Sequence, residues 1–466
     1  MCSSVEREQE APEGRRFLIQ RRVSAVVDHL RPQRWNWYAL VRPLDVSLQR
    51  QAQIPVTRER LRDLRYFWID GLFAAISENF YLGFVALFAL AYGATNSQVG
   101  LMAASANLLG AAALFPGAQL VERSGKRKAV AVWSGGVFGR LALLGLAIVP
   151  FLFTSPTAAI VAIIVLDGLR SFMFNFGNPA WTSLVADLVP EGMRARFFSS
   201  RNIAMGLAAM VVATLAGWLI SRTNARLDSA VVGYQLVFLF AFATGMVSTY
   251  AFWQIREPQM AEADRVAHQR GDLRRVLHQN PAFTGLIISA LVWNFSLQLA
   301  APFFSVYLVN GLGASAAVVG VLASVSSLTA LFGQRYFASV IDRRGPYWVQ
   351  GMTSLFIPLA PWAWMLVRAP WQVGIINAFV GFAWAGYNLA NFNLLLELTP
   401  KDHRARAVAL YQVAVFSSAV VGPLLGGFLA DQFGYKFIFM LSGIGRYAGA
   451  VLFFGLTYRL VRNKSR

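Results

Sequence analysis

Residues 118–127 read AQLVERSGKR, a tight charged turn set between two long apolar runs. A near copy, ASVIDRRGP at residues 338–346, also follows an apolar run, and both stretches have the form A-x-x-x-[DE]-R-x-G. A second pair, DLVPEGMRAR at 187–196 and ELTPKDHRAR at 397–406, shares the pattern [DE]-L-x-P-x-x-x-R-A-R. Because two different motifs recur in the same order, the sequence predicts a duplicated unit.

The composition is that of a membrane protein. Mean hydropathy is +0.49, and charged residues make up only 14% of the chain. With about 20 apolar residues for each span, there is room for roughly a dozen transmembrane helices. Most of the 42 Lys and Arg residues fall in the tails and the even-numbered turns, which predicts that both termini lie in the cytoplasm. No basic soluble domain exists to bind nucleic acid, and we expect no nucleic-acid partner.

The first motif resembles the G-x-L-x-D-R-x-G-R-[RK] loop of the major facilitator superfamily, which joins the second and third transmembrane helices. The weaker copy falls between helices eight and nine, as it does in that family, and the resemblance extends from about Tyr66 to the end of the chain. The family's leading Gly is Ala118 and Ala338 here, and the first acid is Glu122. The resemblance implies an all-α membrane protein with 12 transmembrane helices in two pseudo-symmetric six-helix bundles, the major facilitator fold.

The expected organisation begins with a basic segment, 1–65, which is either an interfacial helix on an anionic inner leaflet or an unstructured tail. A six-helix bundle over 66–254, a cytoplasmic linker over 255–283, a second bundle over 284–458 and a cytoplasmic tail over 459–466 follow. The predicted spans are 66–92, 98–121, 129–153, 158–183, 202–221, 233–254, 284–309, 316–341, 348–367, 372–396, 409–430 and 436–458.

Charged residues inside spans are costly and therefore point to function. Glu78 lies at the middle of the first span, and two interpretations stay open: a carboxylate that takes up and releases a proton, or a structural acid paired with Arg140 or Arg170. Asp167 is the second candidate for proton coupling. It lies three residues before Arg170 on the same helical face, so we favour a structural pair between the two.

Polar and aromatic stripes predict the wall of a substrate cavity. In the family, helices one, four, seven and ten line this cavity, and amides and aromatic rings orient a ligand without requiring charge. The alternative is that Asn and Gln hold neighbouring helices together. The candidates are Glu78, Asn79, Arg170, Phe174, Asn175, Asn178, Trp293, Asn294, Gln298, Trp384, Tyr387, Asn388 and Asn391.

The charged turns predict a conformational latch. An acid there can face the positive end of a neighbouring helix, and Gly permits the sharp reversal. By resemblance, Glu122, Arg123, Gly125 and Arg127 hold the halves together in one state, and Asp342, Arg343 and Gly345 form the counterpart. The alternative is a plain turn that follows the positive-inside rule.

The sequence lacks the residues and motifs on which several classes of protein chemistry depend. Cys2 is the only cysteine, and the histidines His29, His268, His278 and His403 fall in predicted loops or tails, so we expect no metal and no cofactor. There is no H-E-x-x-H, no G-x-S-x-G and no ATP-binding G-x-x-x-x-G-K-[ST], so we expect neither an enzyme with catalytic residues nor ATP drive. The stretch VGPLLGG at 421–427 resembles the G-P-x-x-G-G motif of drug/proton antiporters, but it lies in the eleventh span rather than the fifth.

The sequence therefore predicts a monomeric, multi-pass transporter of the cell membrane that moves a small organic solute by alternating access. Proton-coupled export of a drug or metabolite is the first hypothesis, because the cavity candidates are aromatic and amide-rich. Uptake of a sugar or other polar nutrient is the alternative within the class. A transporter-like receptor or scaffold without flux is the alternative from another class.

Overall fold

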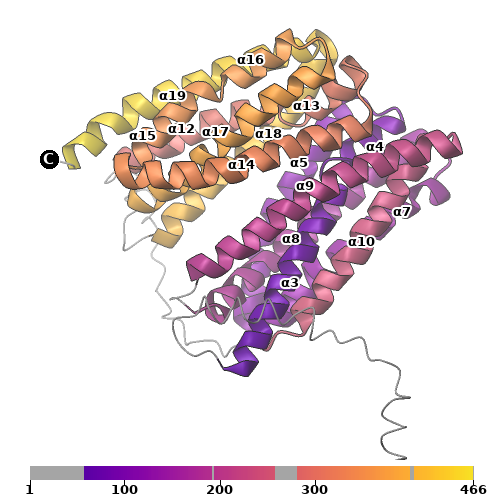
Figure 1. Ribbon diagram of the computed structural model, residues 1–466, viewed down its shortest axis with the longest axis horizontal. Helices are drawn as coiled ribbons and strands as arrows, with labels where there is room; N and C mark the ends of the chain where they lie inside the picture. The colour runs from indigo at the N-terminus through magenta and orange to yellow at the C-terminus, as the bar shows by residue number, and fades with distance from the viewer. Residues whose placement is uncertain (1–56, 191–193, 258–280, 399–403, 465–466) are drawn as a thin grey trace, which may run out of the picture. The chain divides into compact units, whose positions relative to one another are not determined.

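The computed structural model describes residues 57–190, 194–257, 281–398 and 404–464, and residues 58–466 form one compact unit. The predicted interfacial segment, most of the predicted linker and the middle of the DLVPEGMRAR motif lie outside the described residues. Every regular element in the described part of the chain is helical (Figure 1). Eleven helices there are long and apolar enough to cross a membrane, consistent with the predicted all-α membrane fold.

In the first half, helices pack both against their neighbours in the sequence and against helices farther along the chain. They are α3 (Arg58–Tyr81), α4 (Val85–Ala91), α5 (Asn96–Ser124), α6 (Arg127–Ala131), the π-helix η1 (Val132–Phe138), α7 (Gly139–Leu152), α8 (Pro156–Leu188), α9 (Arg194–Leu227) and α10 (Val232–Trp253). α3 packs against α9 and α10, α5 against α8, and α7 against both α8 and α10.

The second half repeats this pattern. Its elements are α12 (Pro281–Ala300), α13 (Phe303–Val306), the π-helix η3 (Tyr307–Gly311), α14 (Ala316–Arg344), α15 (Pro346–Phe356), α16 (Leu359–Leu366), α17 (Pro370–Leu398), α18 (Arg404–Phe433) and α19 (Tyr435–Lys464). α12 packs against α18 and α19, and α14 packs against α17. The predicted span 348–367 is divided between α15 and α16, where Pro358 and Pro361 remove two backbone donors.

Local sequence accounts for the ends of the helices. Thr95 caps α5 with a capping box, in which its side chain accepts from the Gln98 backbone amide and the Gln98 side chain accepts from the Thr95 amide. α5 ends at Gly125 with φ of 65°, and α14 ends at Gly345 with φ of 79°. Both values lie in the left-handed region that glycine adopts without strain, so the two charged turns reverse as their glycines predict.

Several helices extend past the predicted spans. α3 begins at Arg58 rather than 66, α9 begins at Arg194 rather than 202, and α19 continues to Lys464 rather than 458. A helix satisfies its backbone hydrogen bonds internally, so it can continue beyond the apolar stretch that hydropathy detects. For α9, this extension places Arg201 well inside a helix.

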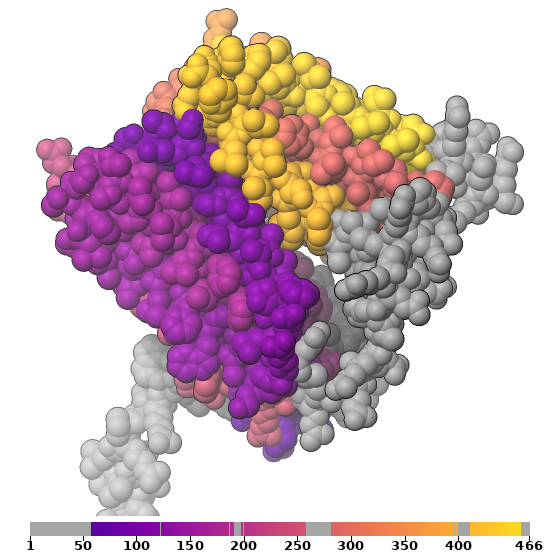
Figure 2. Space-filling view, turned by 180° about the vertical axis from the view of Figure 1, so that it is seen from behind, coloured from indigo at the N-terminus to yellow at the C-terminus, as the bar shows by residue number. Residues whose placement is uncertain are grey.

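The two halves contact each other from the middle of the helices to the end where α5 begins, which we call the Asn96 end. α9 packs along α14, and α5 packs along α18; Figure 2 shows the second contact where indigo α5 meets amber α18. Glycines make both approaches close, since a Cβ on Gly320 would meet the Ala213 backbone and one on Gly427 would meet the Asn96 backbone. We call the opposite end, with the two charged turns, the Gly125 end.

Polar groups close the Asn96 end. The Asp431 carboxylate at the end of α18 accepts from Asn96 Nδ2 at 2.8 Å, from the Ser97 backbone N–H at 2.9 Å and from the Ser97 hydroxyl. Tyr435 at the start of α19 donates its hydroxyl proton to Asn96 Oδ1 at 2.7 Å. The second half thus supplies an anion to the N-terminus of α5, where exposed N–H groups and the helix dipole favour negative charge.

Candidate functional site

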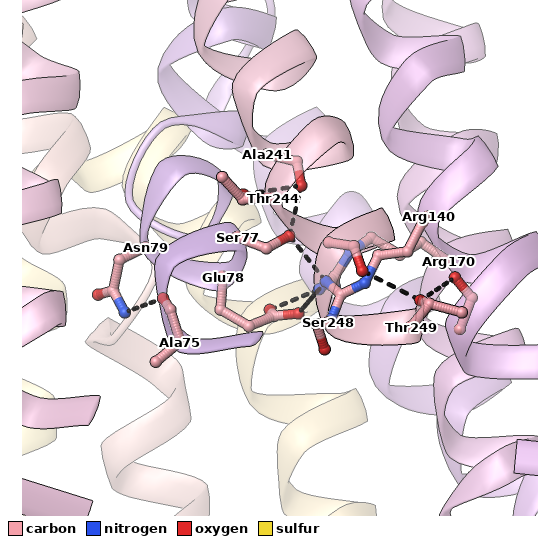
Figure 3. Close-up of polar contacts among 12 residues, drawn as sticks. Ala75, Ser77, Glu78, Asn79, Arg140, Arg170, Ala241, Thr244, Ser248 and Thr249 are labelled. Atoms are coloured by element: carbon pink, nitrogen blue, oxygen red, sulfur yellow. Dashed lines mark hydrogen bonds and ion pairs between the residues drawn. The ribbon is translucent and has the colours of Figure 1, made fainter. Parts of the chain in front are cut away.

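Glu78 is held between two arginines inside the first half. Its Oε1 accepts from Arg140 Nη1 of α7 at 3.0 Å, and both of its oxygens lie 2.5 Å from Arg170 Nη2 of α8 (Figure 3). Arg140 and Arg170 are 4% and 8% exposed, so bulk water hardly solvates either guanidinium group. Of the two interpretations of Glu78, the geometry shows the ion pair, and it shows it with both arginines rather than one. Two guanidinium groups on one carboxylate stabilise its ionised form.

Further contacts tie this cluster to the surrounding helices. Arg140 Nη1 also donates to Ser77 Oγ at 2.9 Å, and that hydroxyl donates to the Ala241 carbonyl of α10 at 2.6 Å. The Arg170 guanidinium lies over the Tyr81 ring, 4.0 Å from its centroid. The π-helix η1 directly precedes α7, and such wide turns inside a helix are frequent at functional sites. The cluster therefore joins α3, α7, α8 and α10.

A second ion pair lies on the same helix as Glu78, toward the Gly125 end. Asp70 accepts from Ser248 Oγ of α10 at 2.7 Å and from Arg201 Nη2 of α9 at 3.4 Å. Arg201 also donates from Nε to the Phe67 carbonyl at 3.3 Å, and its guanidinium lies 4.5 Å from the centroid of the Phe67 ring. The pair connects α3, α9 and α10.

Asp167 does not form the expected pair with Arg170. Asp167 is 6% exposed, and within the described residues no cation lies within salt-bridge distance of it. Arg170 turns to Glu78 instead, because that carboxylate reaches it from α3 with two oxygens. Asp167 is thus a buried carboxylate without a cation in contact.

A cavity of about 580 Å³ lies between these helices, and all of its lining residues belong to the first half. Four of the predicted cavity residues line it, namely Glu78, Asn79, Phe174 and Asn178. The wall also holds charged, aromatic and small residues: Asp70, Arg140, Arg201, Trp181, Phe252, Met205, Gly135, Gly136, Gly177 and Gly206. A volume of this size is typical of sites for drug-sized ligands.

The predicted residues of helices seven and ten gather in the second half. Trp293 of α12 stacks on Tyr387 of α17 at 4.9 Å between centroids, and Trp384 contacts both rings edge-on. Asn391 bonds the Tyr411 hydroxyl at 2.9 Å and accepts from Gln350 at 3.4 Å. This aromatic cluster packs within the second half and does not line the cavity of the first.

The other predicted residues have separate positions. Asn175 and Asn294 each donate to a backbone carbonyl of their own helix, at 2.9 Å and 2.8 Å. Gln298 packs where a Cβ on Gly422 of α18 would lie, and Asn388 is exposed. Arg170 contacts Glu78 but does not itself line the cavity.

The first charged turn at the Gly125 end makes contacts within the first half. Arg127 is buried and lies 2.5 Å from the Asp187 carboxylate and 3.7 Å from Glu257. It also donates to Ser183 Oγ at 3.2 Å. Arg123, Asp342 and Arg343 are exposed. The predicted latch stays a prediction, which concerns another state of the molecule.

Three charged residues of the cavity wall, Asp70, Arg140 and Arg201, lie outside the predicted cavity set. Arg201 lies one residue before the predicted span 202–221 and so falls outside it. Asp70 and Arg140 lie inside predicted spans, where Arg140 is predicted only as a possible partner of Glu78. All three residues are charged and lie at positions that the folded helices bury. Such a charge in the sequence marks a residue as a functional candidate, but it does not show which helices pack together. Among the described residues, no group of three or more His, Cys, Asp or Glu lies together as a metal site would require.

A multi-helix membrane protein made of two like halves, with paired charges and a ligand-sized cavity in its interior, has the architecture of a secondary transporter. The chain belongs to the Major Facilitator Superfamily, whose family model matches residues 67–386 and 286–466. It is accordingly a multi-pass membrane transporter of a small solute.

Individual relatives are distant in sequence. The chain is 23% identical over 389 residues to the multi-drug resistance efflux pump PmrA homolog of Lactococcus lactis, covering 80% of this chain and 90% of that protein. It is also 23% identical over 391 residues to the multi-drug resistance efflux pump PmrA of Streptococcus pneumoniae, covering 82% and 92%.

Solved structures share the fold. A bacterial homolog of the human lysosomal transporter Spinster, in an inward-facing and unoccupied conformation, superposes with a TM-score of 0.70 at 15% identity, covering 88% of this chain and 99% of that one. A D-xylose-proton symporter superposes with a TM-score of 0.64 at 16% identity, covering 85% and 97%.

Proposed function

We propose that the protein exports a small organic drug or metabolite in exchange for protons, and that the solute binds in the cavity of the first half. The observation that carries this proposal is Glu78 paired with two arginines in the wall of a 580 Å³ cavity. Ionisable groups within a membrane span are costly, and they mark solute and ion pathways. The relatives from Lactococcus lactis and Streptococcus pneumoniae are named efflux pumps, which supports export over uptake.

We assign proton coupling to Asp167 of α8 together with Glu78 of α3. Asp167 is buried without a cation in contact, whereas Glu78 and Asp70 are occupied by arginines. Buried carboxylates of this kind serve as proton carriers in pumps and transporters. Protonation of Asp167 would leave the Glu78 pairs in place, and protonation of Glu78 would release Arg140 and Arg170. The coupling ion is H⁺ in this proposal, and no ATP or cofactor takes part.

The proposed topology places both termini and the Gly125 end in the cytoplasm, with the lipid contact of the basic first segment on the anionic inner leaflet. The Asn96 end then faces outward, and its closed contacts belong to the inward-facing state. In the outward-facing state the two charged turns would meet as the latch, through Glu122, Arg123 and Arg127 on one half and Asp342 and Arg343 on the other. The working unit is the monomer, because one chain supplies both halves.

Everted membrane vesicles with an acidic interior test the proposal directly. We expect fluorescent drug-like solutes to accumulate in vesicles that contain the protein, and a protonophore to abolish this accumulation. Asp167→Asn should reduce proton-driven accumulation at least tenfold while solute binding in detergent persists. The matched control is Asp228→Asn, since Asp228 is exposed and has a φ of 46° that Asn tolerates.

Three outcomes contradict different parts of the proposal. Accumulation that survives the protonophore would remove proton coupling and leave transport standing. Failure to move any solute of a broad panel in either direction, by a protein that still folds, would favour the receptor or scaffold alternative. Solute uptake into right-side-out vesicles, without accumulation in everted ones, would show that the protein imports its solute.

A further inference from the structure

The cavity of the first half carries two carboxylates, and neither is open to a ligand. Asp70 is held by Ser248 and Arg201, and Glu78 by Arg140 and Arg170. A cationic ligand that bound either acid would have to displace a buried arginine, which would leave an uncompensated charge away from water. The electrostatics of the wall therefore disfavour permanent cations.

The arginines that line the cavity still have hydrogen-bond donors to offer. A guanidinium has five N–H donors, and the structure gives Arg140 two bonds, both from Nη1. Arg201 uses Nε and Nη2 in its contacts with the Phe67 carbonyl and Asp70. Both side chains line the cavity, so acceptor groups of a ligand can pair with them while Glu78 and Asp70 stay bound. Of the two amide side chains in the wall, Asn178 already accepts from Thr182 at 3.1 Å and Asn79 donates to the Ala75 carbonyl at 2.8 Å.

The rest of the wall suits an apolar body. Phe174, Trp181 and Phe252 provide ring faces, and Met205 adds a flexible apolar surface. The Phe174 side chain is 42% exposed, so it is available for stacking. A ligand that satisfies both parts of the wall has an oxyanion at one end and an aromatic or aliphatic body at the other.

We propose that the cavity selects organic monoanions, in which a carboxylate binds Arg140 and Arg201 and an aromatic body packs against Phe174 and Trp181. This inference rests on the proposed function and narrows its substrate class. Arginine is well matched to a carboxylate, because its planar fork donates two parallel hydrogen bonds. Asp167, another buried acid of this half, lies outside the cavity wall and does not repel the ligand by contact.

The test uses three probes with one shared body: naphthoate, naphthamide and naphthyl trimethylammonium. Their dissociation constants are measured by calorimetry on the purified full-length protein in lipid nanodiscs. We expect naphthoate to bind at least roughly tenfold more tightly than the cation, as one or more charge-assisted hydrogen bonds predict. Naphthamide should fall between them.

Variants locate the site. Arg140→Gln should weaken naphthoate binding at least about tenfold while Arg170 still holds Glu78, and Arg140→Lys should recover part of the loss. Arg446→Gln is the matched control, because Arg446 is also a buried arginine within a span but lies in the second half. Its affinity for naphthoate should equal that of the unmodified protein.

The inference is overturned if the cation binds as tightly as naphthoate, if no probe binds, or if Arg140→Gln leaves naphthoate affinity unchanged. The comparison of probes on the unmodified protein needs no variant to fold. Failure here is distinct from failure of the proposed function: vesicles that export cationic dyes but ignore naphthoate would refute the substrate class alone.

Discussion

Asp431 offers the sharpest test of how the halves move. Its carboxylate accepts from Asn96 Nδ2, the Ser97 amide and the Ser97 hydroxyl, and it is the charged group that joins α18 to the start of α5. Asp431→Asn keeps the size of the side chain, but it replaces one acceptor oxygen with an NH₂ and removes the charge. The substitution therefore weakens the Asn96 end without creating a cavity.

The expected magnitude follows from these contacts. Hydrogen bonds to a charged group contribute about 1.5–3 kcal/mol each, and neutral ones about 1 kcal/mol. Asp431 is exposed, so solvent screening reduces these values. Loss of one acceptor and of the charge should then destabilise the closed Asn96 end by about 1–2 kcal/mol, which changes the ratio of closed to open molecules by a factor of about 5–30.

Electron–electron distance measurements can detect this change. Spin labels at Arg226→Cys on α9 and Arg368→Cys before α17 would report the separation of the halves at the Asn96 end, with Cys2→Ser removing the native thiol. We expect Asp431→Asn to enlarge the long-distance population and Asp228→Asn, an exposed acid at the end of α9, to leave it unchanged. An unaltered or shorter distribution in Asp431→Asn would refute the role of this contact.

Three other changes have definite expectations. Glu78→Gln leaves two buried guanidinium groups without their counterion, and thermal or denaturant unfolding should show a loss of about 3–5 kcal/mol; a loss below 1 kcal/mol would contradict the ion-pair geometry. Gly427→Ala inserts a Cβ against the Asn96 backbone, so the same distance measurement should show the Asn96 end opening; an unchanged distribution would contradict the close approach of α18 to α5. Arg446 is buried, and its Nε and Nη2 lack partners among the described residues, so Arg446→Met should raise the unfolding free energy by about 1–3 kcal/mol; an equal or lower value would indicate an unseen partner.

Local features of the fold could be predicted from sequence, and long-range ones could not. The turns at Gly125 and Gly345 follow from residues within a few positions, and the glycines adopt the left-handed backbone that the motif requires. Glu78 could be expected to pair with an arginine because an isolated charge in a span is costly. The choice of both Arg140 and Arg170 depends on how α3, α7 and α8 approach one another, which no single helix encodes. Arg201 was missed for a different reason, since α9 continues beyond its apolar stretch.

The duplicated sequence does not produce duplicated chemistry. Asn178 lines the charged cavity of the first half, whereas its counterpart Asn388 is exposed and lies near an aromatic cluster instead. Among the residues that the structure describes, the second half meets the first through glycines, the Asp431 and Tyr435 contacts and hydroxyl contacts such as Thr214 with Ser324, rather than through buried ion pairs. It can therefore rock without separating the charges that hold Glu78. Charge recognition and the cavity itself then belong to the first half. Tyr387→Phe should accordingly leave the affinities for naphthoate, naphthamide and naphthyl trimethylammonium unchanged, because Tyr387 does not line the cavity, and a change in the naphthoate affinity would show that the second half also takes part in recognition.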